Sequence, residues 1–119
     1  MNNLIKTELN YNLIITTQQI NYMRKYMYPL LKAFVYDDNS YAATAHVENN
    51  IFYSYSTPIA VKKNGRYFLT LDKFSATTSG QQNALLGNLA GCYVSVVPHE
   101  EVMSIVNGNE PSAKYMPTH

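Results

Sequence analysis

The chain of 119 residues lacks tryptophan, has a single cysteine, and is poor in charge, with charged residues making up only 14% of it. The lone Cys92 excludes an intrachain disulfide and is typical of a reducing compartment. No apolar run approaches the ~20 residues of a membrane span. The N-terminus also lacks the basic-then-apolar layout of a signal peptide. We therefore expect a soluble cytoplasmic protein.

The polar share of the sequence is carried by Asn, Gln, Ser, Thr and above all by eleven tyrosines. Tyrosine offers a large contact area at low entropy cost, so this composition resembles a contact surface more than a solubilising coat. The net charge of +1 gives the whole molecule no strong field for nucleic acid. Any such contact would need a local basic patch.

The patterning predicts helices separated by strands. Apolar residues recur at helical spacing from Ile20 to Phe34, with a break or bend at Pro29. Residues 41–47 and 51–56 alternate like strands, and Pro58 suggests an edge position or a bend. Asn64-Gly65 joins the two arms of a hairpin.

A second helix should start with Thr78 or Ser79 as its N-cap and stop at Gly91, followed by a strand over 93–97 and a short helix from Pro98. The predicted fold is α+β: a small antiparallel sheet of three to five strands, with two or three helices packed mainly on one face. We expect one domain over 1–106 and a flexible C-terminal tail over 107–119.

Two groups of basic residues are candidate partner contacts. The first lines the polar face of the first helix, and the second surrounds the hairpin tip: Arg24, Lys25, Tyr28 and Lys32, then Lys62, Lys63 and Arg66. Such residues suit phosphates or an acidic protein surface. A solvated helix face and a lysine-protected hairpin are the structural alternatives.

The start of the second helix is a third candidate contact, because hydroxyls, amides and free backbone N–H groups gather there: Thr77, Thr78, Ser79, Gln81 and Gln82. A helix N-terminus can bind phosphate, although plain capping explains the same residues. Farther along, Gly80, Ala84 and Gly87 form a smooth stripe that a partner or a second copy could approach closely.

No catalytic or metal-binding set emerges from the sequence. The three histidines and Cys92 are too scattered for a zinc site, and adjacent Asp37 and Asp38 are typical of a turn. We therefore expect no cofactor, no metal and no enzymatic activity.

The segment YSYSTPIAVKKNGRYFLTLDKFSATTSGQQNALL resembles a domain of small bacteriophage and prophage proteins of uncharacterised function. The resemblance rests on Tyr55 to Ala60, Asn64-Gly65, Lys73 to Ser79, and Gln82. Gly80-Gln81 departs from it, since a basic residue and His are more usual there. The first 50 residues and the tail carry no resemblance.

The resemblance implies an accessory phage protein in the bacterial host cytoplasm. By analogy, we expect it to bind and inhibit a host defence protein, most plausibly a CRISPR effector complex. The alternatives are a nucleic-acid-binding phage regulator and a self-associating structural protein, with a homodimer possible. Sequestration of a signalling nucleotide at the Thr77–Gln82 helix start also remains open.

Overall fold

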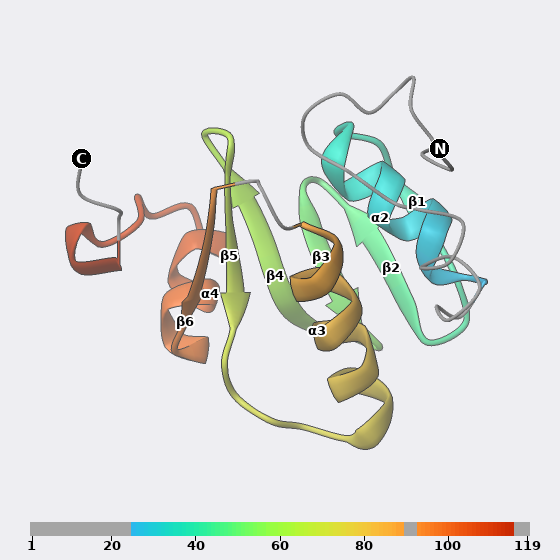
Figure 1. Cartoon of the computed structure of the whole chain (residues 1–119). Coiled ribbons are helices and arrows are strands. Elements are labelled where there is room, and N and C mark those ends of the chain that lie inside the picture. Colours follow the sequence, from blue (N-terminus) through green and yellow to red (C-terminus); the bar gives the residue numbers. More distant parts are fainter. Residues whose placement is uncertain (1–24, 90–92, 116–119) are drawn as a thin grey trace.

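A computed structural model describes residues 25–89 and 93–115 of the chain (Figure 1). It contains a six-stranded sheet with strands in chain order from β1 to β6, together with three α-helices and one 3₁₀ helix. The strands are β1 Ser40–Tyr41, β2 Ala45–Glu48, β3 Ile51–Ser54, β4 Thr57–Lys63, β5 Arg66–Thr70 and β6 Val94–Val97. The helices are α2 Met27–Val35, α3 Ala76–Asn88, α4 His99–Val106 and η1 Ala113–Tyr115. The α+β class is confirmed.

The sheet differs from the prediction in size and in strand direction. It has six strands rather than three to five, because the segment expected as one strand over 41–47 divides into β1 and β2. It is mixed rather than antiparallel, since β6 pairs parallel to β5. Helix α3 connects these two strands, and a helical crossover returns the chain to the starting end, which makes the next strand parallel.

The helices also lie on both faces of the sheet, rather than mainly on one (Figure 1). Helices α2 and α3 share a core with one face, which we call the α2/α3 face, where the Phe34 ring meets Phe52 and Tyr67 edge-on at 5.8 and 5.4 Å between centroids. Helix α4 covers Val61, Phe68 and Val97 on the opposite face, the α4 face. Alternate residues of β5 therefore face separate cores.

Local sequence signals explain most of the element boundaries. Pro29 lies in the first turn of α2, where its missing N–H breaks no helical bond, so the helix begins just before it. Asn64 and Gly65 adopt φ of 54° and 76° in the turn between β4 and β5, which confirms the hairpin. Helix α4 begins after Pro98, as expected. The N-cap of α3 is Ser75 rather than Thr78 or Ser79, since the Ser75 Oγ accepts from the Thr78 N–H at 3.2 Å.

Two other expectations concern strand edges and the chain end. Pro58 lies in β4, beside β3, where a register shift between Phe52 and Tyr53 accommodates its missing donor. The end of the second helix expected at Gly91 lies outside the described residues, and α3 ends at Asn88. The C-terminal segment is held to the domain as far as Tyr115: Glu101 Oε2 accepts from the Ser112 N–H at 2.7 Å, and Ser95 Oγ donates to the Tyr115 carbonyl at 3.0 Å.

Candidate functional site

The hairpin lysines and arginine are each engaged within the chain. Lys62 Nζ donates to the Val35 carbonyl at 2.7 Å and to Asp37 Oδ1 at 3.0 Å, and its side chain is only 14% exposed. Lys63 Nζ lies 3.6 Å from Glu110 Oε2, and the Arg66 guanidinium lies over the Tyr93 ring at 4.8 Å. Lys62 therefore joins the C-terminus of α2 to β4, whereas Lys63 and Arg66 remain nearer the surface.

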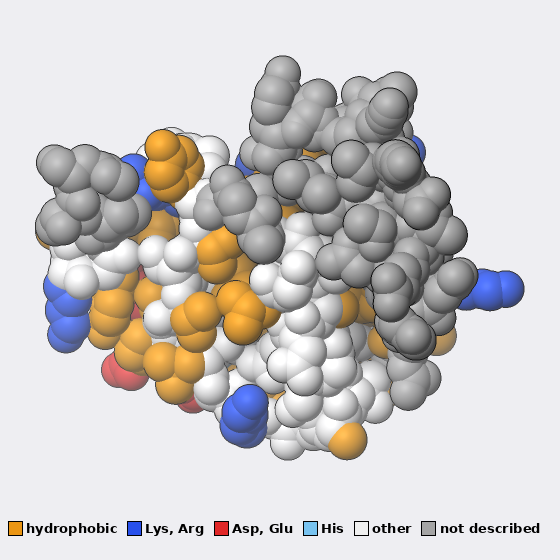
Figure 2. Space-filling view, in the orientation of Figure 1, with side chains coloured by type: hydrophobic (Ala, Val, Ile, Leu, Met, Phe, Trp, Pro, Cys, Tyr) orange, Lys and Arg blue, Asp and Glu red, His pale blue; other side chains and the backbone are white. Residues whose placement is uncertain are grey.

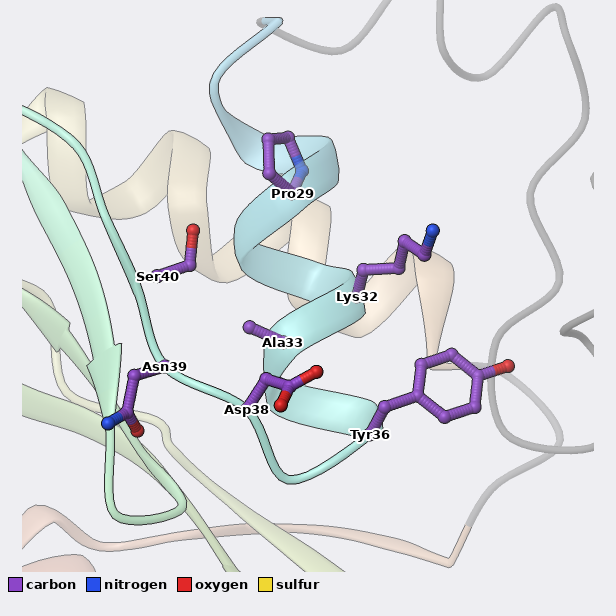
Figure 3. A pocket seen from close by; sticks show the side chains of 7 residues that line it. All are labelled: Pro29, Lys32, Ala33, Tyr36, Asp38, Asn39 and Ser40. Atoms are coloured by element: carbon purple, nitrogen blue, oxygen red, sulfur yellow. The ribbon is translucent and has the colours of Figure 1, made fainter.

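The first-helix candidates are only partly described. Arg24 lies outside the described residues, and Lys25 is exposed ahead of α2. Lys32 Nζ lies 5.8 Å from the centroid of the Tyr28 ring, so these two side chains do share one side of the helix. Lys32 also lines a hollow of about 260 Å³ between α2 and β1 (Figure 3). The carboxylate of Asp38 lines the same hollow, so it carries one group of each sign.

At the start of α3 the candidate polar residues divide between the interior and the surface. Thr78 is buried, and its Oγ1 lies 2.7 Å from Ser54 Oγ. Gln81 is also buried and donates to the Thr44 carbonyl at 3.3 Å. Gln82 donates to the carbonyls of Thr70 and Asp72 at 3.2 and 2.8 Å. Thr78, Gln81 and Gln82 therefore attach α3 to the sheet.

Thr77, in contrast, is exposed at the start of α3, and Ser79 is half-buried. The smooth stripe of α3 is open as well: a Cβ added at Gly80 or Gly87 would meet nothing within 4 Å. No neighbouring backbone in the described part of the chain therefore requires these glycines.

An aromatic column on the α4 face is a feature that the sequence reasoning missed. Tyr41, His46 and Tyr53 lie side by side on β1, β2 and β3, as the strand registers require. The His46 ring stacks on Tyr53 at 4.4 Å with a 10° interplanar angle, and on Tyr41 at 5.7 Å with a 20° angle. In a single continuous strand, the side chains of Tyr41 and His46 would point to opposite faces of the sheet. Because the chain turns back between β1 and β2, the two residues pair directly and their side chains share one face.

The aromatic column (Tyr41, His46, Tyr53) is accessible. Helix α4 packs mainly on β4 and β5, which leaves β1–β3 without a covering helix on this face in the described residues. Tyr41 is 63% exposed, although it belongs to the sheet. Three rings that hold one another in place form a flat, rigid, amphipathic surface.

Tyr55 follows the aromatic column in the turn after β3 and has an unusual backbone conformation. Among the described non-glycine residues with positive φ, four are Asn or Asp, which tolerate this region, and the fifth is Tyr55 at 56°. Its side chain is 53% exposed, so burial of the ring does not account for the choice of tyrosine. Backbone strain kept by an exposed aromatic residue is typical of functional positions.

Two further features of the described residues concern metal-ligand clusters and long apolar helices. No cluster of three or more His, Cys, Asp or Glu side chains among them could hold a metal ion. No helix in the same part of the chain combines the length and apolar character that crossing a membrane requires.

Comparison with known proteins identifies a family. The model of a family of unknown function (DUF8033) matches residues 16–95. The chain belongs to this family. The matched range contains α2, α3, the aromatic column and Tyr55, whereas α4 lies beyond it. No curated protein and no solved structure matches the chain significantly.

Proposed function

We propose that the chain is a non-enzymatic protein that binds another protein through its aromatic column and Tyr55. The proposed target is a host defence protein, specifically a CRISPR effector complex in the bacterial cytoplasm. The choice of target rests on the resemblance of residues 55–82 to small phage and prophage proteins. The choice of surface rests on the stacked rings of Tyr41, His46 and Tyr53.

The single observation that carries the binding role is the exposed, preordered ring column. Tyrosine is enriched at the centres of protein interfaces, where it contributes apolar area together with a hydrogen-bonding hydroxyl. Rings already stacked on one another lose little conformational freedom when a partner docks, so less binding energy is spent on ordering them. Tyr41, at the exposed end of the column, would make the first contact.

A protein is favoured over nucleic acid by the charges around the column. The strand sequences SY, AHVE and IFYS contain no lysine or arginine, and their one charged residue is Glu48. Nucleic-acid affinity depends on cations placed against the phosphates, and β1–β3 supply none. A protein surface with apolar and hydrogen-bonding groups fits this face better.

The experiment is capture of partners from bacterial lysate by the tagged protein, with and without nuclease treatment. Tyr41→Ala removes the exposed end of the column, and Tyr93→Ala is the matched control, because Tyr93 is 58% exposed and directly precedes β6, at the opposite edge of the sheet. We expect a nuclease-resistant protein that Tyr41→Ala loses and Tyr93→Ala retains. Capture of nucleic acid alone, or equal capture by both variants, would refute the proposal.

Tyr55→Gly provides a second test in which stability and binding move in opposite directions. A left-handed conformation costs an L-residue about 1 kcal/mol or more, which glycine avoids. We expect the variant to unfold at an equal or higher denaturant concentration, yet to capture less partner. Unchanged capture would remove Tyr55 from the binding surface.

A further inference from the structure

Strand β6 forms one edge of the sheet and directs unpaired backbone groups outward. Among the described strands it pairs only with β5, in parallel register. The Tyr67 N–H donates to the Tyr93 carbonyl at 2.8 Å, and the Leu71 N–H to the Val97 carbonyl at 2.9 Å. Alternation along a strand then directs the N–H and C=O groups of Val94 and Val96 away from β5. Four backbone groups at this edge have no partner strand among the described residues.

In the described residues, β6 lacks the charged and proline side chains that commonly protect an edge strand against pairing with another strand. Sheet edges are commonly shielded by charged residues, proline or very short strands. The β6 sequence VSVV contains no charge and no proline, and Val96 is 49% exposed. The other edge, β1, has only two residues and follows Asp37 and Asp38. The contrast singles out β6 as the edge able to accept a strand.

A groove of about 220 Å³, lined by six apolar residues and by Thr70, Lys73, Gln82 and Asn83, runs beside β6 on the α2/α3 face, between α3 and the C-terminal ends of β5 and β6. Its lining includes Leu71 and Leu86, each 51% exposed, together with Val96. Figure 2 shows hydrophobic side chains gathered over β5 and β6, beside α3. An added strand would therefore meet unsatisfied backbone groups and exposed apolar side chains together.

We propose that β6 pairs antiparallel with β6 of a second copy of this chain, about a twofold axis at Ser95. In this register Val94 lies opposite Val96 of the second copy, and Val96 opposite its Val94. In an antiparallel pair of strands, two opposite residues whose backbone N–H and C=O groups point at each other exchange two hydrogen bonds. The two pairs together make four hydrogen bonds and satisfy every outward N–H and C=O group of both strands. The sheet then continues across the axis as twelve strands, from six in each copy.

A second copy suits this edge because the same surface is self-complementary. A twofold interface brings the same surface of both copies together, and an uncharged strand then brings no like charges together. Both valines lie on the face of the groove, so the apolar side chains of the two copies meet. The described part of the C-terminal segment contacts β6 through the Ser95 hydroxyl, which donates to the Tyr115 carbonyl on the α4 face, and it makes no hydrogen bond to the backbone of Val94 or Val96. This surface is separate from the aromatic column, so either proposal can fail without the other.

The oligomeric state of the full chain tests the proposal, measured by sedimentation over a concentration series. We expect a reversible monomer–dimer equilibrium. Val96→Pro removes an outward N–H without touching the β5 ladder. Val96→Lys places one cation on each side of the axis, close to its copy. Each substitution should weaken the dimer by roughly tenfold or more. Tyr41→Lys, at the β1 edge, is the control and should dimerise normally.

Amide hydrogen exchange locates the contact. Raising the protein concentration should slow exchange at the Val94 and Val96 amides, whereas the Ser95 and Val97 amides, which face β5, should change little. A monomer at every concentration would overturn the proposal. So would a dimer that both Val96 variants leave unchanged, with their folded state verified by circular dichroism, since the contact would then lie elsewhere.

Discussion

Lys62 provides the sharpest test of how the structure assigns the basic residues. The sequence places it with Lys63 in a basic hairpin tip, as an equivalent candidate for partner binding. The structure separates the two: Lys62 is bound to the last residue of α2 and to Asp37, while Lys63 makes only a 3.6 Å ion pair with the exposed Glu110. Substituting each in turn distinguishes a structural lysine from a surface lysine.

The expected cost of Lys62→Met can be worked out from its contacts. A hydrogen bond from a charged donor contributes about 1.5–3 kcal/mol, and the Val35 carbonyl accepts one at 2.7 Å. The pair with Asp37, which is 63% exposed, adds at most about 1 kcal/mol. Lys62 Nζ also lies 5.6 Å from the centroid of the Tyr67 ring, a cation–π contact that methionine loses while it keeps an apolar side chain of similar length. We expect a loss of about 2 kcal/mol in the free energy of unfolding.

Urea unfolding followed by circular dichroism measures this loss, with Lys63→Met as the matched control. The control should change the free energy of unfolding by less than about 0.5 kcal/mol, because its ion pair is exposed. Equal stabilities of the two variants would show that the bond from Lys62 to α2 does not stabilise the fold. That outcome would refute the assignment and return Lys62 to the candidates for partner binding.

Two further substitutions test the α3 helix. Gly87→Ala should raise the free energy of unfolding by about 0.5–1 kcal/mol, since the added Cβ meets open space. Gly65→Ala is the control and should lower that free energy, because Gly65 has a φ of 76°. If Gly87→Ala destabilised the protein instead, a close neighbour would have to lie at the stripe. Ser75→Ala should lower the free energy of unfolding by about 1 kcal/mol in the same urea assay, because it removes the acceptor of the Thr78 N–H. Thr77→Ala, which removes an exposed hydroxyl, is the control and should be nearly neutral. Equal effects of the two substitutions would contradict the assignment of Ser75 as the N-cap.

Signals that act over a few residues identified most of the local structure. Asn64-Gly65 predicted its hairpin because both positions need positive φ, and Pro98 with two following glutamates predicted the start of α4. The N-cap of α3 was misplaced by three or four residues, since Ser75, Thr78 and Ser79 are all competent caps. Local capping chemistry does not distinguish between them until the helix packs.

The sheet was harder to predict, because strand pairing depends on contacts between distant segments. The division of residues 41–47 into two strands leaves no strong turn signal, since Ala42 and Ala43 are common in either state. The placement of α4 on the opposite face follows from the parallel addition of β6. Alternation within a strand indicates two faces but does not say which elements cover them.

For the candidate surfaces too, the sequence indicated some features and the tertiary structure decided others. Composition indicated a tyrosine-rich contact surface, yet only the β1–β2–β3 register brings Tyr41, His46 and Tyr53 into one column. The sequence determined the α+β class, the hairpin turn and the helix starts, because neighbouring residues govern backbone dihedral angles and capping. Tertiary structure alone decided that Lys62, Thr78 and Gln81 point inward and that β6 is an edge strand of the described sheet. Burial and strand pairing are properties of segments that meet only when the chain folds.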